Sequence, residues 1–304
     1  MTQLSDSMKP LIIGLSSRAL FDLEEENRIF EEQGLDAYIE YQKDNEKIIL
    51  EPGSAFPLID ALLRLNKLAE EPLVEVVIMS QNDPQAGLRV MHAIDYYNLP
   101  ITRAAFSGGA RLGPNLAAFG VDLYLSKDSA DVQDAADHGV AAAQIYAAPN
   151  SFHPDMEEIR IAFDGDAVVF SEDSEFIYQQ EGLEAFKKNE KELVKCPLPE
   201  GPFGRVIRAF SRIKQLSTVP RMRIALVTAR GNPSHERVIL TLRGWGVNVD
   251  EAYFLGGLPK EEVLKAFNPH IFFDDQDKHV QSASEHVPSA RVPYRSGSKL
   301  HGGE

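Results

Sequence analysis

Short apolar runs separated by longer segments of mixed polarity recur along the chain. The runs in its first half are residues 11–15, 74–79 and 121–125, and those in its second half are 159–163, 223–227 and 271–273. Apolar runs of this length that end in turn residues are typical of buried strands, and the longer segments between them are typical of helices. Strands that alternate with helices predict an α/β fold with a mostly parallel sheet covered on both faces.

The pattern repeats when the sequence is shifted against itself by 148 residues. Residues 11–146 then align with residues 159–294 without a gap, and about a fifth of the aligned positions are identical. The identities gather in blocks, such as residues 106–109 and 254–257, which both contain Gly-Gly after phenylalanine. An ungapped match of this length predicts that the chain arose by duplication into two halves of the same fold.

Breaker residues and segment lengths indicate where each part begins and ends. Two prolines fall within 148–154, which indicates a linker between a first domain at 9–148 and a second at 156–295. In the second half about 50 residues separate the first two strands, too many for a simple loop in a compact domain. We interpret this insert, at about 171–220, as a helical cap, and we expect a cap in the first half too. The tail at 296–304 is expected to be disordered.

Composition and charge narrow the setting of the protein. Of its 304 residues, 43% are apolar and 25% are charged, which is ordinary for a globular protein with a sizeable core. The formal net charge of −15 repels phosphate backbones and disfavours a nucleic-acid partner. The single cysteine, Cys196, suits a reducing compartment. We see no secretory signal and no apolar run of roughly 20 residues, so we expect a cytoplasmic protein with no membrane partner. A homo-oligomer is compatible with the sequence.

Chemically reactive side chains stand where the predicted strands of the second half end. They are Asp164 and Asp166 after the first strand, Thr228 after the second, Lys260 after the Gly-Gly turn, and Asp274 and Asp275 after the last. Ligands of parallel sheets bind beyond the carboxyl ends of the strands, so these side chains are expected to converge. Each of them alone would also fit a polar turn, a helix cap or the surface, and it is their joint order that indicates a site.

This combination suits phosphoryl transfer. A phosphate monoester is a dianion that repels a carboxylate, and a divalent cation held by Asp164 and the Asp274-Asp275 pair removes that repulsion. Lys260 adds positive charge, and the Thr228 hydroxyl donates a hydrogen bond to a phosphate oxygen. Asp164 can then attack phosphorus and form an acyl phosphate.

Asp166 is the candidate general acid and base. It lies two residues after Asp164, and Gly165 between them allows a tight turn. From there Asp166 can protonate the leaving oxygen and later deprotonate the water that hydrolyses the intermediate.

Residues near these positions are candidates to contact the rest of a substrate. Arg230, two residues after Thr228, could bind substrate or pair at the surface. The aromatic candidates for stacking on a base are Phe170, Phe176, Tyr178 and Phe203. For each of these the alternative is a place in the core of the cap.

The catalytic positions resemble the four motifs of the haloacid dehalogenase-like hydrolases. Longer blocks are similar to the cytosolic 5′-nucleotidase type I family, at residues 16–21, 161–168, 201–203, 227–230, 256–260 and 272–276. The resemblance covers about residues 10–294. It implies two Rossmann-like halves of the haloacid dehalogenase type, hydrolysis of nucleoside 5′-monophosphates with AMP a frequent substrate, and Mg²⁺ as the metal. The expected ligands of Mg²⁺ are Asp164, the backbone carbonyl of Asp166, and the Asp274-Asp275 pair, of which Asp275 is favoured.

The first half lacks this chemistry at the aligned positions. Ser16 and Arg18 replace the first two acids, Ser80 replaces the threonine, and Lys127 replaces the last acid. We interpret this half as a catalytically silent copy that packs against the active one. A second hypothesis is that these four residues bind an anionic effector such as a nucleotide, because Arg and Lys can hold a phosphate without a metal. A third is a direct contribution to the substrate pocket.

The function expected from the sequence is therefore that of a magnesium-dependent 5′-nucleotidase, with AMP the favoured substrate. A phosphatase or phosphotransferase for another small phosphomonoester is the alternative among enzymes. A nucleotide-sensing protein that has kept the fold without turnover is the alternative outside them, and the intact set of acids in the second half argues against it.

Overall fold

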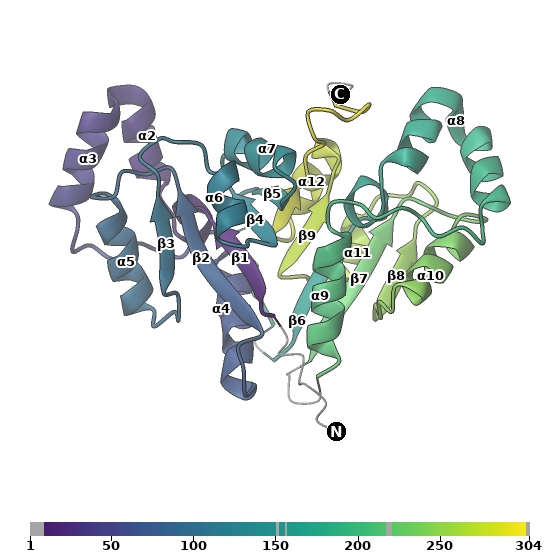
Figure 1. The fold of residues 1–304 in the computed structure, drawn as a ribbon, viewed down its shortest axis with the longest axis horizontal. Helices are drawn as coiled ribbons and strands as arrows, with labels where there is room; N and C mark the ends of the chain where they lie inside the picture. The colour runs from purple at the N-terminus through teal and green to yellow at the C-terminus, as the bar shows by residue number, and fades with distance from the viewer. Residues whose placement is uncertain (1–8, 150–151, 156, 217–220, 302–304) are drawn as a thin grey trace.

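One continuous sheet runs through the computed structural model, which describes residues 9–149, 152–155, 157–216 and 221–301. Its strands are β1 (Leu11–Leu15), β2 (Val74–Ser80), β3 (Arg103–Phe106), β4 (Leu123–Ser126), β5 (Ala141–Ile145), β6 (Ile159–Phe163), β7 (Met222–Thr228), β8 (Glu251–Phe254), β9 (Ile271–Asp274) and β10 (Ser289–Arg291). Their order is β3-β2-β1-β4-β5-β10-β9-β6-β7-β8. All neighbours are parallel except β5 and β10, so the predicted mostly parallel α/β sheet is confirmed (Figure 1).

The two halves meet at the antiparallel pair of β5 and β10, where Ile145 lies opposite Ala290. Within each half the strands are parallel, as the sequence pattern predicts, but the pattern does not predict that the two sheets are joined into one. The pairing covers the backbone edge that each half would otherwise expose. The first three residues of β5 are buried alanines, Ala141, Ala142 and Ala143.

Helices cover both faces of the sheet. They are α1 (Ser17–Leu20), α2 (Glu24–Gln33), α3 (Leu35–Asp44), α4 (Phe56–Leu65), α5 (Gly87–Tyr96), α6 (Gly113–Ala118), α7 (Ser129–Asp137), α8 (Asp173–Glu192), α9 (Gly204–Lys214), α10 (His235–Gly244), α11 (Glu261–Phe267) and α12 (Asp277–Ser284), with short turns η1 (Asn66–Leu68) and η2 (Gly165–Val169). Within the described residues, none of these helices is both long and apolar enough to cross a membrane.

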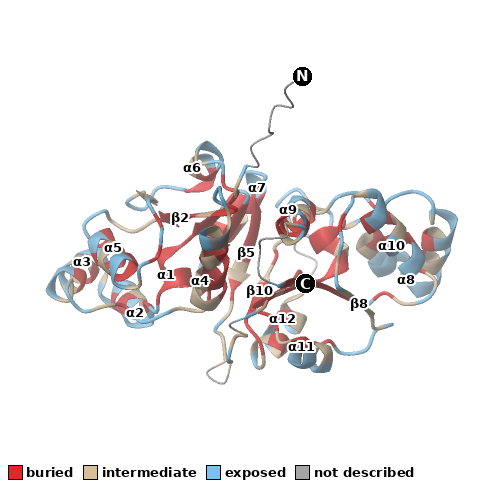
Figure 2. Cartoon of the chain, turned by 90° about the horizontal axis from the view of Figure 1, so that it is seen from below, coloured by how far each residue is buried: buried red, intermediate tan, exposed pale blue. Residues whose placement is uncertain are grey.

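The apolar core is continuous across the halves on one face only. A single cluster there joins residues of β1 and β6 to α4, α5, α9 and α10. The opposite face has two separate clusters, one under α6 and α7 and one under α11 and α12. Alternate residues of a strand point to opposite faces, as Ile161 and Ala162 do in β6. Figure 2 shows the strands mostly in red, whereas the helices around them also carry exposed residues in pale blue.

The second half reproduces the spacing of the first. β6 begins 148 residues after β1, and the same offset separates β7 from β2, β8 from β3 and β9 from β4. Left-handed turns recur at this spacing as well. Gly34 and Gly182 have φ angles of 85° and 82°, and Asn98 and Gly246 have φ angles of 53° and 69°. The two halves therefore share the conformation of their turns as well as the order of their strands.

The predicted cap segment at 171–220 consists of two different parts. Its second helix, α9, buries Val206, Ile207 and Phe210 in the main core, so it covers the sheet and is not part of a cap. Its first helix, α8, changes direction at Gly182 and lies at one end of the molecule, opposite α2 and α3 (Figure 1). The cap interpretation is thus restricted to α8 and its first-half counterpart, α2 with α3.

The tail is ordered as far as residue 301, which corrects the prediction of disorder for residues 296–301. The backbone N–H of Ser296 donates to Asp137 at 2.8 Å, and the Ser298 hydroxyl donates to Glu172 at 2.6 Å. Leu300 is buried. Residues 302–304 lie outside the described part of the chain.

Candidate active site

The reactive side chains of the second half converge at the carboxyl edge of the sheet. Asp164 directly follows β6, Thr228 and Asp274 end β7 and β9, and Lys260 directly precedes α11. All four are buried, as is Asp275, the residue after β9. Residues that are far apart in the sequence come together because β7 and β9 are the two neighbours of β6 in the sheet.

Three carboxylates and one ammonium group form the centre of this site. Asp164, Asp274 and Asp275 each offer an oxygen within 4.8 Å of the others. Lys260 Nζ lies 2.8 Å from Asp164 Oδ1 and donates to Asp274 Oδ2 at 2.7 Å. Two of the three buried acids, Asp164 and Asp274, therefore contact the same lysine. Within the described residues, no other group of three or more acids, histidines or cysteines is arranged to hold a metal.

The crowding of charge shifts the protonation of these groups in different directions. Burial raises the pKa of Asp164 to about 7, although Lys260 opposes the shift. Burial and the charges of Asp274 and Asp164 hold the pKa of Asp275 well above its ordinary value. Burial acts the same way on Asp274, but Lys260 and His279 outweigh it and lower that pKa to about 2. Without a further cation, the centre holds more acid than it can ionise.

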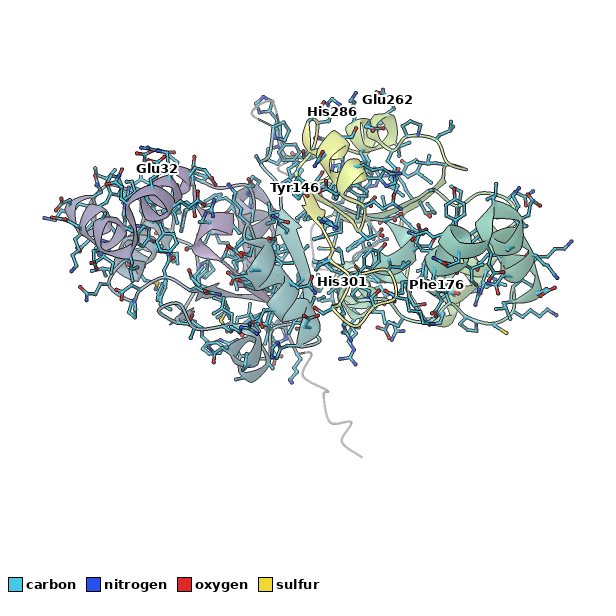
Figure 3. All side chains as sticks on the ribbon, turned by 90° about the horizontal axis from the view of Figure 1, so that it is seen from above. Glu32, Tyr146, Phe176, Glu262, His286 and His301 are labelled. Atoms are coloured by element: carbon cyan, nitrogen blue, oxygen red, sulfur yellow. The ribbon has the colours of Figure 1, made fainter. Side chains whose placement is uncertain are left out.

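Two further side chains, which the sequence analysis does not predict, contact the acids of the cluster. The hydroxyl of Tyr294 donates to Asp275, and His279 Nδ1 lies 3.4 Å from Asp274 Oδ2. The alignment of Tyr294 with Tyr146 is a signal that the sequence contains, but the repeat alone gives the pair no role. Tyr146 donates to Asp277, and Figure 3 shows it at the junction of the two halves.

The backbone around the first acid places Asp164 and Asp166 on a tight turn. Asp164 N–H donates to the carbonyl of Phe273 in β9 at 2.8 Å, which aligns the end of β6 with the end of β9. A Cβ atom at Gly165 would lie 3.2 Å from Thr228 Oγ1, so this position favours glycine. Ala167 has a left-handed φ of 59°, which turns the chain back toward the sheet.

Asp166 is bound by an arginine and not by the acid cluster. Arg230 donates from Nε to Asp166 Oδ2 at 2.8 Å and from a terminal nitrogen to Oδ1 at 2.6 Å. The other terminal nitrogen pairs with Glu190, a fully buried residue of α8 that also binds Arg237 at 2.8 Å. Both carboxylates raise the pKa of Arg230 above its ordinary value despite burial. Arg230 therefore links Asp166, the predicted general acid and base, to α8. Its charge is already paired with two carboxylates, so it is not a free cation for a substrate.

The first turn of α8 faces the same region. The hydroxyl of Ser174 donates to Glu190 at 2.9 Å, within the ion-pair network of Arg230. Burial raises the pKa of Glu175, and the negative charge of Asp166 acts in the same direction. The helix thus begins next to the site and is tied to it by buried polar groups.

Of the aromatic candidates, the structure places two in the core. Phe170 and Phe203 are fully buried, and the ring of Phe170 packs 5.6 Å from that of Trp245. The prediction that Phe170 contacts substrate is therefore wrong, because its ring is covered by protein. Phe176 lies under Lys299 at 5.0 Å. Tyr178 on α8 is the one of the four that is largely exposed, at 47%.

Of the four first-half residues that align with the catalytic positions, three lie around one cavity. Ser16, Arg18 and Ser80 line a cavity, and Lys127 does not line it. Arg18 and Lys127 both pair with Glu24, at 3.1 and 2.7 Å. Neither cation is therefore without an acid partner.

Comparison with known proteins gives the relatives of the chain. It is 37% identical over 287 residues to a human protein named cytosolic 5′-nucleotidase 1B. The aligned region covers 90% of this chain and 47% of the human protein. The chain thus spans about half the length of this curated relative. A crystal structure described as that of a dehalogenase matches 51% of this chain and 91% of its own at 13% identity, with a TM-score of 0.31.

The family assignment rests on a match along almost the whole sequence. The model of the 5′-nucleotidase family matches residues 3–299, which include every acid of the buried cluster. The match also includes both halves and the junction between them. The chain belongs to the 5′-nucleotidase family.

Proposed function

We propose that the protein is a magnesium-dependent 5′-nucleotidase, which hydrolyses nucleoside 5′-monophosphates, AMP foremost, to a nucleoside and phosphate. The observation that carries this proposal is the buried cluster of Asp164, Asp274 and Asp275 around Lys260. Membership of the 5′-nucleotidase family and the name of the human relative support the choice of a nucleotide over other phosphomonoesters. The same name and the single, exposed Cys196 support a cytoplasmic setting.

The residues of the cluster fit a divalent cation. Three buried carboxylates against one ammonium group leave an excess of negative charge, and carboxylate oxygens are the ligands that Mg²⁺ prefers. Asp274 already accepts from Lys260 at 2.7 Å and from the N–H of Gln276 at 2.8 Å, which favours Asp275 and Asp164 as direct ligands. The backbone carbonyl of Asp166 would complete the protein's share. Bound there, Mg²⁺ supplies positive charge that offsets the dianionic phosphate.

Asp164 acts as the nucleophile in this proposal. Its carboxylate attacks phosphorus, a bond forms between a carboxylate oxygen and phosphorus, and the bond from phosphorus to O5′ of the nucleoside breaks. Lys260 and the Thr228 hydroxyl hold the phosphate oxygens while this happens. Water then attacks the acyl phosphate and releases phosphate, which returns Asp164 to its starting state.

Asp166 moves the protons in both steps. It gives a proton to O5′ of the leaving nucleoside and takes one from the attacking water. A carboxyl group that gives up its proton cannot also accept two N–H bonds from Arg230, so this pair must open during turnover. We infer that the paired arrangement is a resting state and that the Arg230–Glu190 contact draws Arg230 toward α8 when it opens.

The two halves descend, we propose, from one duplicated domain of the haloacid dehalogenase type, at 9–148 and 156–295. Shared element spacing and turn angles support this, and so does a buried arginine used alike in both halves. Arg89 donates to the carbonyl of Ile48 at 2.9 Å, and Arg237 donates to the carbonyl of Cys196 at the same distance. The first half is catalytically silent because Ser16, together with other uncharged or cationic residues, stands where acids would be needed.

A substrate panel tests the proposal. We would measure phosphate released from the common nucleoside 5′-monophosphates and from sugar phosphates, with and without Mg²⁺, by the wild type and Asp164→Asn. We expect release from nucleotides only with Mg²⁺, and a loss of at least about a thousandfold in Asp164→Asn. Faster release from sugar phosphates would favour the other phosphomonoesterases. No release from any of these substrates would favour a nucleotide-sensing protein.

A further inference from the structure

A cavity of about 380 Å³ lies at the carboxyl ends of β1, β2 and β4 in the first half. This volume is in the range of small-molecule sites. The serines at its base, Ser16, Ser80 and Ser126, align with catalytic positions of the second half. Its side is formed by α2 and α3, the counterparts of α8. The place that binds substrate in the proposed active half is thus also hollow in the silent half.

Serine and amide side chains line this cavity at the ends of β1 and β2, and we call this part of the lining the floor. Ser17 Oγ lies 3.1 Å from Ser80 Oγ and accepts from the amide of Asn82 at 3.0 Å. Ser16 Oγ accepts from the N–H of Ala19 at 3.2 Å, and its own proton can still be donated. Hydroxyl and amide groups that both donate and accept suit a ligand with several hydroxyl groups or ring nitrogens.

The wall of the cavity is apolar and aromatic. Phe30, Leu35 and Tyr38 line it from α2 and α3. Phe30 is 48% exposed and Leu35 is 52% exposed, although both are large apolar side chains. The rings of Phe30 and Tyr38 meet edge to face at 6.0 Å, so the wall is preorganised. A flat apolar ligand would cover surface that is otherwise left to water.

The charges around the cavity disfavour an anion. Arg18 is the one cation among the described lining residues, and it is already bound to Asn27 at 2.8 Å and to Glu24 at 3.1 Å. The acids of the lining are Glu26, Asp83, Asp128 and Asp131. Burial and the neighbouring charge of Asp128 raise the pKa of Asp131 to about 6, as expected where negative charge is already crowded. A phosphate dianion would meet this field with only one unpartnered cationic N–H among the described lining residues, the Nε of Arg18.

This pattern counts against the anionic effector expected from the sequence at Ser16, Arg18, Ser80 and Lys127. Only three of these residues line the cavity, and Lys127 is engaged with Glu24 outside it. The ligand that fits has no net negative charge, one flat aromatic face and several hydrogen-bonding groups.

We propose that the cavity of the first half binds a neutral nucleoside, with the base against the Phe30 and Tyr38 wall and the ribose hydroxyls on the serine and Asn82 floor. The proposal rests on the proposed function only in choosing a nucleoside, the product of that reaction, among neutral aromatic compounds with hydroxyl groups. The cavity would make the silent half a sensor of the product.

Binding of adenosine to the full chain tests this proposal. We would titrate adenosine, adenine, ribose and AMP by calorimetry into Asp164→Asn protein without Mg²⁺, so that turnover does not interfere. Phe30→Ala removes part of the wall, and Asn82→Ala removes a floor donor. Tyr178→Ala is the matched control, because Tyr178 aligns with Phe30 and is equally exposed, at 47%.

We expect adenosine to bind, with Phe30→Ala and Asn82→Ala each weakening it about tenfold and Tyr178→Ala changing it less than about twofold. At the site that depends on Phe30, adenine, ribose and AMP should each bind more weakly than adenosine. No binding of adenosine at millimolar concentration would overturn the proposal. So would binding that depends on Tyr178 and not on Phe30, or tighter binding of AMP that depends on Phe30. Failure of the proposed function would appear instead as absent phosphate release by the wild type, with adenosine binding unchanged.

Discussion

At the scale of single residues, the buried acids are the feature that most needs a partner. Asp164 and Asp275 have raised pKa values because burial penalises their charge, and one lysine cannot compensate three carboxylates. The identity of these acids could be predicted from the sequence, since each follows an apolar strand. The support from Tyr294 and His279 could not, because a hydrogen bond across the sheet leaves no local pattern.

Stabilisation by Mg²⁺ should depend on pH. The pKa of Asp164 in the folded protein without metal is about 7, above its ordinary 3.8, so below about pH 7 a proton occupies the site that the cation needs. At a hundredfold excess over its dissociation constant a ligand adds about 2.7 kcal/mol to the free energy of unfolding. We therefore expect Mg²⁺ to raise the melting temperature by roughly 5 °C at about pH 8 and by much less at about pH 6. Equal shifts at both pH values, measured by calorimetry, would contradict this.

Removal of the Tyr294 hydroxyl should weaken the binding of metal. In Tyr294→Phe the ring remains but Asp275 loses its donor, and loss of such a support typically costs about tenfold or more in metal affinity. Activity at saturating Mg²⁺ should be largely restored. Tyr146→Phe is the matched control, because Tyr146 is the aligned tyrosine and contacts Asp277 outside the acid cluster. A titration of activity with Mg²⁺ that shifts equally in both variants would refute the role.

At the scale of elements, the strands were predictable and the cap was only partly so. The run at 74–79 becomes β2 with one residue added, because a buried strand needs a continuous apolar stretch. The insert at 171–220 contains both α8 and α9, and only the amphipathic face of α9, with Val206 and Phe210, shows that this helix lies on the sheet. Glu190 anchors α8 through its ion pairs with Arg230 and Arg237. These partners are distant in the sequence, so the position of α8 could not be predicted.

Neutralising Glu190 should loosen α8 and disturb Asp166. In Glu190→Gln two buried arginines, Arg230 and Arg237, lose their shared anion, and breaking a buried ion pair costs about 3 kcal/mol or more of the free energy of unfolding. Arg230 would then be left with Asp166 alone, so kcat should fall more than KM rises. Denaturant unfolding and steady-state kinetics check both effects. Glu184→Gln, on the exposed side of α8, should change neither the free energy of unfolding nor kcat. Equal losses of both quantities in the two variants would contradict this role of Glu190.

At the scale of the whole molecule, the pair of β5 and β10 makes one sheet of two halves. The halves also share the core on one face. The sequence repeat predicts two similar units but not how they join. Nothing in the sequence of β5 or of β10 indicates that these two strands pair with each other. The ordered tail depends on the same junction, since Ser296 is held by Asp137 of the first half.

A shared sheet predicts a single unfolding transition for the full chain. Trp245 is the only tryptophan and lies in the second half, so its fluorescence reports that half, whereas circular dichroism reports both. The two probes should give the same midpoint in guanidinium chloride, because the halves bury each other's strand edge and core. Two separate midpoints would instead indicate that the halves are independent domains.

In the proposed mechanism, Asp164 attacks phosphorus and carries the phosphate covalently. The most direct measurement is to quench the reaction of the protein with Mg²⁺ and AMP in acid and to locate covalent phosphate by peptide mass spectrometry, with Asp166→Asn used to slow hydrolysis of the intermediate. The account predicts phosphate on the peptide that contains Asp164, and at that residue alone. Steady turnover of AMP with no covalent phosphate, or with phosphate on another residue, would contradict it.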